Sequence, residues 1–421
     1  MVLGKVAWGV AGAAGLYAVF LGILLQPPVQ RFALYANKVN TLFLKNLNDT
    51  ESFGFAPNQV TPFILKTPDN ESLYAWHVLP ADVYAENERE IRSETRSFAP
   101  VADITSTVGF RLLTSKEGPP ARVVIYFHGN AGHVGENWRP DTYRYMAAQP
   151  NTHVLTIDYR GFGYSTGSPT EAGLIIDGTA LVNWVLRVAK IPAERIVIAG
   201  QSLGTGVSSA IALHFADPSN TLIPAEVRSI QNQDSIATGA VFAPTTFAGV
   251  VLAAPFSSIP ALLLTYRVGG LLPLLLPLRP VPALAGRLTA LMEDKWLSAE
   301  RLTAYYAALA DRPGLLHTGT RSLASVQLVH ALNDRDIPFH QTGMICRRMF
   351  GKRDSGSEVR KEEIEAEECI DGGKGAGVLD VNRPGRPRVR FEIVRFGGHN
   401  RIITYSSVSI AISRAFGDHF E

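Results

Sequence analysis

Residues 195–204 decide the fold of this chain. They read Arg-Ile-Val-Ile-Ala-Gly-Gln-Ser-Leu-Gly, and the helix-forming stretch Thr205–Ala216 follows at once. The first five residues are typical of a buried strand, so the pattern Gly-x-Ser-x-Gly lies between a strand and a helix. Such a turn holds a serine hydroxyl, here that of Ser202, in the open before a helix N-terminus. A Cβ at Gly200 or Gly204 would clash in so tight a turn. The stretch therefore predicts a nucleophilic serine, against the alternative of an ordinary turn capped by serine.

The same alternation of strands and helices continues on both sides of this turn. The helical pattern at 171–188 has apolar residues at a spacing of 3.6. Strands that alternate with helices form a mostly parallel central sheet with helices on both faces, and near-continuous apolar strands fit burial on both faces. We expect the further strands at 61–66, 73–79, 122–127, 153–159, 250–254, 326–331 and 390–396.

The composition is that of a globular protein and excludes several function classes. The chain has 421 residues, of which 46% are hydrophobic and 19% charged, so it has room for one large domain with insertions or for two domains. A net charge of +2 gives no electrostatic basis for binding nucleic acid. Cys346 and Cys369 lack metal-ligand spacing, so we expect no metal site and no cofactor. The sequence does not tell whether these two cysteines pair.

The N-terminus predicts a membrane anchor. Residues 6–25 carry no charge, which is enough apolar helix to cross a bilayer, and Lys5 and Arg31 flank the run. The alternative, a cleaved signal peptide, would have a shorter apolar region and a small-x-small cleavage site, which 24–28 does not offer. We expect an uncleaved anchor at 1–30 and a single globular domain at 50–421.

Two cues about the membrane side oppose each other. Arg31, Lys38 and Lys45 follow the apolar run, and by the positive-inside rule they would keep the large domain in the cytosol. However, Asn48–Thr50 and Asn70–Ser72 are glycosylation sequons just past the anchor, which would make sense in a lumen. The orientation therefore stays open at the level of the sequence.

Four insertions interrupt the regular pattern. Residues 81–107 are polar and predict a surface loop, and 217–247 are rich in Ser, Thr, Asn and Gln and predict a flexible excursion. Residues 351–388 are charged and glycine-rich, which is typical of disorder. The fourth insertion, 259–298, contains the almost wholly apolar run 268–286, whose four prolines argue against a straight spanning helix. We expect this run to be a lid that covers an acyl pocket or dips into the membrane surface. The alternative is a buried loop packed on the core.

A nucleophilic serine needs a base and a group that orients the base, and both follow Ser202 in the chain. The strand at 326–331 leads into Asp334 and Asp336, and a carboxylate just past a strand end lies at the active edge of a sheet. We prefer Asp334, with Asp336 as an exposed turn residue. His399 follows the last strand in a loop with two glycines and is the expected general base. His340 is too close to Asp334 in the chain, and His419 lies at the terminus.

The oxyanion of an acyl-transfer intermediate needs two backbone N–H donors. Leu203, next after the nucleophile, is one candidate, and the loop after the 122–127 strand supplies the other. In that loop we choose Asn130, with Ala131 second, while His128 supports the loop. The stretch 158–167 is expected to brace the site without chemistry of its own.

These motifs resemble the α/β-hydrolase-domain proteins over about residues 120–410 without the insertions. The resemblance rests on His-Gly-Asn-Ala-Gly (128–132), Asp-Tyr-Arg-Gly-Phe-Gly-x-Ser-x-Gly (158–167), Gly-x-Ser-Leu-Gly-Thr-Gly (200–206), Ala-Pro-Phe-Ser-Ser-Ile (254–259), the stretch 334–338 and Gly-Gly-His-Asn (397–400). More closely, they are similar to membrane-anchored lipases that act on monoacylglycerols and lysophosphatidylserine. The resemblance implies an α/β-hydrolase fold, a Ser202–Asp334–His399 triad and an anchor in the endoplasmic reticulum membrane with the catalytic domain in the lumen.

The sequence thus predicts a single-pass membrane serine hydrolase whose substrate is a lipid ester and whose other partner is the bilayer. Two alternatives stay open: an acyl-protein thioesterase, because related hydrolases cleave acyl thioesters, and a non-catalytic membrane scaffold on a hydrolase fold. The sequence disfavours the scaffold, since a scaffold need not keep Ser, Asp and His in this order and context. It identifies no protein partner.

Overall fold

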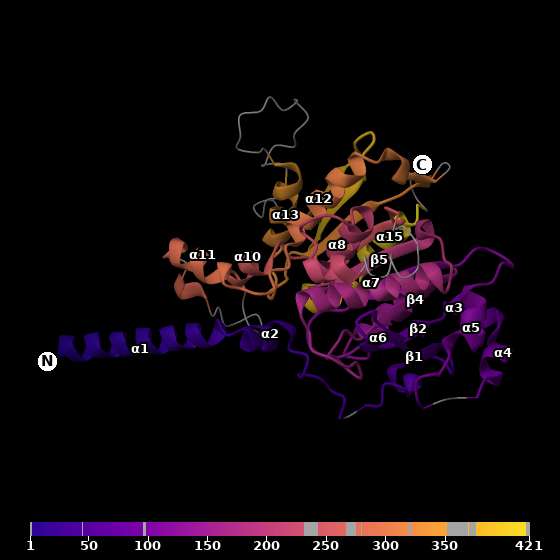
Figure 1. Cartoon of the computed structure of the whole chain (residues 1–421), viewed down its shortest axis with the longest axis horizontal. Helices are drawn as coiled ribbons and strands as arrows, with labels where there is room; N and C mark the ends of the chain where they lie inside the picture. Colours follow the sequence, from indigo (N-terminus) through magenta and orange to yellow (C-terminus); the bar gives the residue numbers. More distant parts are fainter. Residues whose placement is uncertain are drawn as a thin grey trace.

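A nine-stranded mixed sheet forms the centre of the described part of the chain (Figure 1). The strand order is β1-β2-β4-β3-β5-β6-β9-β11-β10, and the strands from β4 to β11 run parallel. At the edges, β2 pairs antiparallel with β4 and with β1, and β10 pairs antiparallel with β11. The strands are β1 Val60–Lys66, β2 Ser72–Val78, β3 Arg122–Phe127, β4 Thr152–Ile157, β5 Ile196–Gln201, β6 Gly249–Ala253, β9 Ser325–Ala331, β10 Gly377–Val381 and β11 Val389–Val394. The computed structural model describes residues 2–43, 45–95, 98–230, 243–266, 275–278, 280–318, 321–351, 369 and 376–417.

Helices cover both faces of this sheet, and the pleat of the strands explains why. Along β3, Val123 and Ile125 face one hydrophobic cluster, whereas Val124 and Tyr126 face the other. The first cluster receives the apolar faces of α7 Glu171–Arg187, α8 Leu203–Ala216, α12 Ser298–Ala310 and α13 His340–Phe350; the second receives those of α6 Arg139–Ala147 and α15 Ser406–Ala415. The sheet is therefore buried on both sides, as its apolar strands predict.

The parallel register brings the ends of the central strands to one edge. Phe127 at the end of β3 pairs with Gly200, Gln201 at the end of β5 pairs with Ala253, and Ala331 at the end of β9 pairs with Val394. The segments that leave these strands consequently start side by side, which is where open α/β sheets place their sites.

The prediction of a surface loop at 81–107 was wrong in its first half. Two short helices, α3 Ala81–Glu86 and α4 Glu88–Ser93, occupy it. They are held by Tyr84 and Ile91, which are buried together with Leu79 in a small cluster of their own. Tyr84 and Ile91 are too few to form a helical pattern in so polar a stretch. Their burial nevertheless holds both helices against the rest of the protein.

The prediction of disorder at 351–388 was wrong for its last part, because β10 forms the edge of the sheet there. Asp380 on β10 accepts hydrogen bonds from Arg388 at 2.8 Å and Arg390 at 3.0 Å, so the charges of this stretch pair across the last two strands. Residues 352–368 and 370–375 of the same insertion, and 231–242 of the insertion at 217–247, lie outside the described residues.

The expected lid at 259–298 is described only in part. It contains α10 Ile259–Leu263, a 3₁₀ turn at Leu276–Leu278 and α11 Pro282–Ala290, with a proline in the first turn of α10 and of α11. Residues 267–274 and 279, which belong to the apolar run, lie outside the described residues.

The N-terminal segment forms two helices, α1 Val2–Leu24 and α2 Pro27–Tyr35. Figure 1 shows α1 extending away from the globular part, while α2 lies against it. In the described ranges, no single helix is long and apolar enough to cross a membrane. By length and composition, Ala11–Leu24 and Pro27–Tyr35, which meet at 84°, could do so together.

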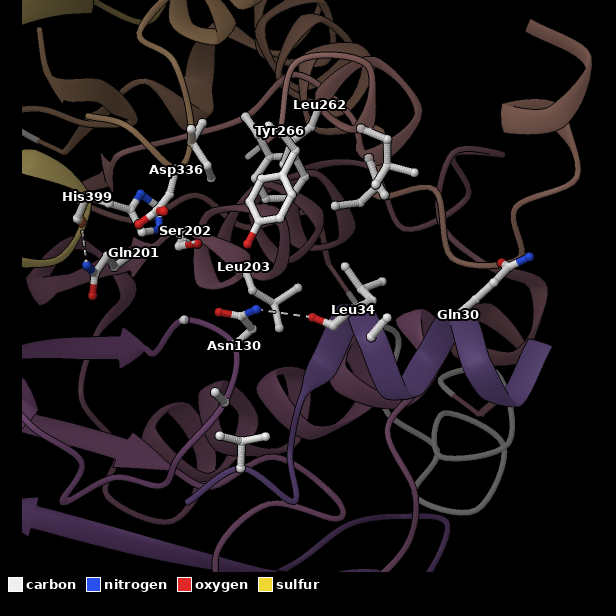
Figure 2. Close-up of a pocket in the computed structure, with 18 of the residues that line it drawn as sticks. Gln30, Leu34, Asn130, Gln201, Ser202, Leu203, Leu262, Tyr266, Asp336 and His399 are labelled. Carbon is white, nitrogen blue, oxygen red and sulfur yellow. Dashed lines mark hydrogen bonds between the residues drawn. The ribbon is translucent and has the colours of Figure 1, made fainter. Parts of the chain in front are cut away.

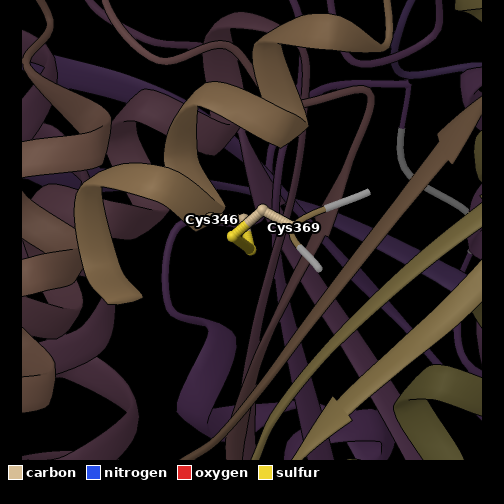
Figure 3. Close-up of a disulfide and its surroundings, with 2 residues drawn as sticks. All are labelled: Cys346 and Cys369. Atoms are coloured by element: carbon tan, nitrogen blue, oxygen red, sulfur yellow. A yellow bond between two sulfur atoms is a disulfide. The ribbon is translucent and has the colours of Figure 1, made fainter. Parts of the chain in front are cut away.

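Cys346 on α13 forms a disulfide with Cys369, with their Cα atoms 5.7 Å apart (Figure 3). Both residues are buried. The pairing that the sequence left open is therefore present in the structure, and it joins α13 to the insertion that precedes β10.

Candidate active site

Ser202 lies at the apex of the turn between β5 and α8. Its backbone has φ 52° and ψ −121°, a conformation that a non-glycine residue holds only when its surroundings impose it. A Cβ on Gly200 would overlap the carbonyl of Gly204, and a Cβ on Gly204 would overlap that of Phe127. The two glycines are therefore required by close backbone approach, as the sequence predicts.

The structure brings Ser202, His399 and Asp334 into one hydrogen-bonded line (Figure 2 labels Ser202 and His399). His399 Nε2 is 3.0 Å from Ser202 Oγ, and His399 Nδ1 is 2.9 Å from Asp334 Oδ2. In this arrangement Nδ1–H donates to the carboxylate, so Nε2 is free to accept from the hydroxyl. A serine, an imidazole and a carboxylate in this order form the geometry of a nucleophile, a general base and an orienting acid.

The carboxylate of Asp334 is buried and held in place from several sides. Its Oδ1 accepts hydrogen bonds from the main-chain N–H groups of Asp336 at 3.0 Å and Ile337 at 2.9 Å. Its Oδ2 lies 3.3 Å from His330 Nε2. Burial opposes ionisation, but the hydrogen bonds from His330 and His399 outweigh it and lower the pKa of Asp334 below its ordinary value. Asp334 is therefore ionised at neutral pH and keeps its orientation.

His399 is placed by a loop that other residues secure. Gln201, the residue before Ser202, donates from Nε2 to the main-chain oxygens of His399 at 2.9 Å and Asn400 at 3.2 Å. Asn333 Oδ1 accepts from the N–H of Gly398 at 2.8 Å. Burial lowers the pKa of His399, but the hydrogen bond and the charge of Asp334 more than offset this, and the pKa lies above its ordinary value.

Of the alternative candidates from the sequence, Asp336 and His340 do not take part in this hydrogen-bonded line. Asp336 lies beside the pair, but the carboxylate that accepts the hydrogen bond from His399 Nδ1 is that of Asp334. His340 is exposed at the start of α13, and His419 lies outside the described residues. Within the described ranges, Asp334, Asp336 and His399 each place a ligand atom within 4.8 Å of the others. A metal there would have to displace the hydrogen bonds that both nitrogens of His399 make.

The loop after β3 lies against Ser202. A Cβ added to Gly129 would come within 3.4 Å of Ser202 Cβ, so this glycine leaves room beside the serine. Ala131 N–H donates to the carbonyl of Tyr35 at 2.8 Å, so it is committed away from the site. Leu203 is the first residue of α8, where a helix has no internal partner for the N–H. The geometry therefore favours Asn130 over Ala131 as the second donor, beside Leu203.

Arg139 supports that loop from below. The buried guanidinium donates to the carbonyls of Gly129 at 3.1 Å, Asn130 at 3.0 Å and Ala131 at 2.9 Å. These three hydrogen bonds fix the orientation of three successive peptide groups. Because the N–H of each peptide group points away from its carbonyl, the same contacts orient the N–H groups of the loop. This also places a fixed positive charge behind the site.

The stretch 158–167 braces the loop, as expected. Asp158 accepts from the N–H of Val134 at 2.6 Å, and the hydroxyl of Tyr159 donates to the carbonyl of His128 at 2.9 Å. His128 is buried, and its Nδ1 lies 2.7 Å from the carbonyl oxygen of Gly129. Burial raises the pKa of Asp158 to about 7. The two sequence motifs thus form one structural unit around the loop.

Sequence reasoning missed four supporting residues: His330, Arg139, Gln201 and Asn333. His330 and Gln201 occupy strand ends and could have been suspected, because polar side chains there reach the same edge as the nucleophile. Arg139 gave no signal, since an arginine at the start of a helix is common and its partners are main-chain carbonyls. Asn333 is adjacent to Asp334, but its side chain accepts from a main-chain N–H far along the chain, which has no sequence signature.

A cavity of about 720 Å³ opens onto Ser202 and His399. Its walls are mostly apolar and come from α1, α2, the loop after β3, and the insertion at 259–298. Figure 2 shows Tyr266 and Leu262 on one side of it and Leu34 of α2 on the other. This size lies within the range of small-ligand sites.

The sheet order, the strand–serine–helix turn and the hydrogen-bonded Ser, His and Asp define an α/β hydrolase fold, and a family model described as the alpha/beta hydrolase fold matches residues 122–258. The chain also resembles lysophosphatidylserine lipases. It is 28% identical to lysophosphatidylserine lipase ABHD12 of Danio rerio over 205 residues, which are 48% of this chain and 47% of that protein.

Two further proteins match parts of this chain. Protein bem46 of Schizosaccharomyces pombe is 36% identical over 118 residues, 28% of this chain and 39% of that protein. A solved α/β hydrolase from Vibrio vulnificus is 15% identical, with a TM-score of 0.42 and coverage of 73% of this chain and 77% of that one. The chain spans about half the length of the lysophosphatidylserine lipases that it matches.

Proposed function

We propose that this protein is a membrane-anchored serine hydrolase that cleaves lipid esters of the monoacylglycerol or lysophospholipid class. The observation that carries the proposal is the hydrogen-bonded line Ser202–His399–Asp334 at the end of a mostly apolar cavity. The likeness to lysophosphatidylserine lipases supports the lipid ester as substrate.

The reaction follows from the proposed roles. Ser202 Oγ attacks the ester carbonyl carbon while its proton passes to His399 Nε2, and the carbonyl oxygen becomes an oxyanion. When this intermediate collapses, the acyl C–O bond breaks and His399 returns the proton to the leaving alcohol. Water then attacks the acyl carbon and gives a proton to His399 Nε2. As the bond between the acyl carbon and Ser202 Oγ breaks, His399 returns this proton to Oγ, and the fatty acid leaves. Asp334 stays ionised and stabilises the imidazolium at each stage.

The oxyanion is held by the N–H groups of Leu203 and Asn130. Leu203 contributes the N-terminal end of α8, where the helix dipole is positive. Asn130 belongs to the loop that Arg139 and Tyr35 hold in place. These donors act at fixed positions in a cavity with mostly apolar walls, where electrostatic stabilisation is strongest.

The anchor is proposed as the uncharged run at 6–25, which ends before α2, in the endoplasmic reticulum membrane and with the hydrolase domain in the lumen. Two observations favour this side over the cytosol. The buried Cys346–Cys369 disulfide fits an oxidising compartment. In addition, Asn70 of the second sequon is exposed in the turn between β1 and β2, where a glycan has room. A glycosidase shift that is lost in Asn70→Gln would support the lumenal side, and a wild type without any shift would count against it.

Hydrolysis assays test the activity. Membranes that carry the wild type or Ser202→Ala are given monoacylglycerol, lysophosphatidylserine and a palmitoylated peptide, and released fatty acid is measured. We expect release from the first two substrates by the wild type alone. Release from the acyl peptide only would favour the thioesterase, and a folded wild type that releases nothing would favour the scaffold.

A further inference from the structure

The helix α2, which follows the proposed anchor, forms part of the candidate active site and contacts two other segments there. On one side it meets the loop that carries the proposed oxyanion donor. The carbonyl of Tyr35 accepts from the N–H of Ala131 at 2.8 Å, and the carbonyl of Leu34 accepts from Asn130 Nδ2 at 3.3 Å (Figure 2). Just past the helix, the carbonyl of Val39 accepts from Gly132 at 2.8 Å. This loop therefore takes its position partly from α2.

On the other side, α2 is fastened to the end of the insertion at 259–298. The buried hydroxyl of Tyr35 donates to Asp294 Oδ2 at 2.8 Å, and Arg31 Nε donates to the same oxygen at 3.2 Å. Gln30 accepts from the N–H of Glu293 at 3.1 Å. The segment after α11 and the segment after the anchor thus form one connected structure over the cavity.

The cavity lies between these two segments and continues to the end of α1. Leu21, Leu24 and Leu25 line it at that end, Ala33 and Leu34 line it along α2, and Leu262 lines the opposite wall. In Figure 2, Ser202 and His399 lie at one end of this space and Gln30 toward the other. The same helix presents Phe32 to the outside, with 59% of its surface exposed. One face of α2 and the last turn of α1 therefore line the cavity at Ser202, while the opposite face of α2 is exposed.

We infer that α2 and the last turn of α1 form the binding subsite for the distal part of a long acyl chain. The chain enters from the bilayer where α1 ends and extends along Ala33 and Leu34 to Ser202. This inference rests on the proposed function and adds to it that the anchor selects acyl length, because it supplies the apolar wall farthest from the nucleophile. An ester with a short acyl group would reach Ser202 without touching this wall.

A pair of variants on α2 tests the subsite. Ala33→Trp fills the cavity, whereas Phe32→Trp, the matched control, adds the same side chain on the outer face one residue away. The readout is the ratio of kcat/KM for a long-chain monoacylglycerol to that for a soluble acetate ester. We expect Ala33→Trp to lower this ratio about tenfold or more relative to Phe32→Trp, since the fit of a single methylene in a hydrophobic pocket changes kcat/KM by roughly 10- to 200-fold. An unchanged ratio, with both variants folded, would overturn the inference.

A second measurement keeps the test independent of catalysis. Ser202→Ala in vesicles is exposed to a single-chain lipid with a photoreactive group near the end of its acyl chain, and the crosslinked peptide is mapped. We expect crosslinks at 21–34, and we expect Ala33→Trp combined with Ser202→Ala to lose them. Crosslinks confined to other apolar surfaces would overturn the subsite. If the wild type hydrolyses no ester but the crosslinks appear, the proposed function fails and the subsite stands.

Discussion

Asp334 is the residue whose role the geometry defines most sharply. Two main-chain N–H groups hold one of its oxygens, and the other faces His399 and His330. Asp334→Asn would keep the shape but lose the charge that stabilises the imidazolium. We expect kcat/KM to fall by roughly 10³ to 10⁴. Asp336→Asn, the matched control, leaves the hydrogen bond to His399 in place, and its loss should be far smaller. Equal losses in purified, folded variants would contradict the choice of Asp334.

The raised pKa of His399 fixes the sign of the pH dependence. The hydrogen bond and charge of Asp334 favour the imidazolium, so the pKa lies above the ordinary value of 6.5. Only neutral imidazole can accept the proton of Ser202, and the neutral fraction grows as the pH rises through this pKa. The acidic limb of kcat/KM against pH should therefore have its midpoint above 6.5. A midpoint below that value would show that burial, which lowers the pKa, outweighs Asp334.

The three residues that the structure brings into one hydrogen-bonded line could be predicted from the sequence, but the residues that hold them in place could not. Ser202, Asp334 and His399 each follow a readable strand, and their chain order is informative. Arg139 binds main-chain carbonyls, which have no sequence signature, and its contacts depend on how the loop after β3 curves. The sequence ranks Asn130 before Ala131, but the contact that supports this order, the hydrogen bond from Ala131 to Tyr35, joins segments far apart in the chain and has no sequence signature.

At the scale of elements, the turn between β5 and α8 depends on the absence of side chains. In Gly204→Ala the new Cβ would overlap the carbonyl of Phe127, so strand and helix would have to separate. We expect a loss of more than about 2 kcal/mol in the free energy of unfolding. Gly286→Ala in α11 is the matched control, because its Cβ would meet nothing within 4 Å. We expect Gly286→Ala to raise the free energy of unfolding by less than about 1 kcal/mol. Thermal unfolding in detergent measures both, and similar values would refute the steric argument.

Helices and strands could be predicted where many of their residues are buried, and they were missed where only a few residues contact the rest of the protein. Strands such as β3 and β5 are buried along their whole length, so their composition alone identifies them. By contrast, α3 and α4 are fixed mainly by Tyr84 and Ile91, and β10 by ion pairs with its neighbour. Such anchors act only once the partner segment is in place. Composition alone therefore predicts a loop at 81–107 and disorder at 351–388.

At the scale of the whole molecule, the disulfide ties α13 to the insertion before β10. It closes a loop of 23 residues, for which the loss of chain entropy in the unfolded state gives about 3 kcal/mol. Cys346→Ser with Cys369→Ser should lower the unfolding temperature accordingly, and reductant should have the same effect on the wild type alone. The effect of reductant on the wild type is compared with its effect on the double variant. If neither treatment shifts the transition, the disulfide makes no contribution to stability.

The N-terminal segment is also connected to the hydrolase fold by direct hydrogen bonds. Arg31 and Tyr35 connect the N-terminal segment to Asp294, while the carbonyl of Tyr35 holds the loop beside Ser202. Hydropathy alone predicts a tether at 1–30, because it carries no information about long-range contacts. The structure adds that the residues just after the apolar run are part of the site.

The central claim, that Ser202 is an activated nucleophile, is tested most directly by fluorophosphonate labelling. Membranes that carry the wild type, Ser202→Ala or the neighbouring control Ser208→Ala are treated with the probe, and the labelled protein is quantified against its amount. We expect labelling of the wild type and of Ser208→Ala, and none of Ser202→Ala. A folded wild type that is not labelled, or a Ser202→Ala variant labelled as strongly as the wild type, would contradict the claim.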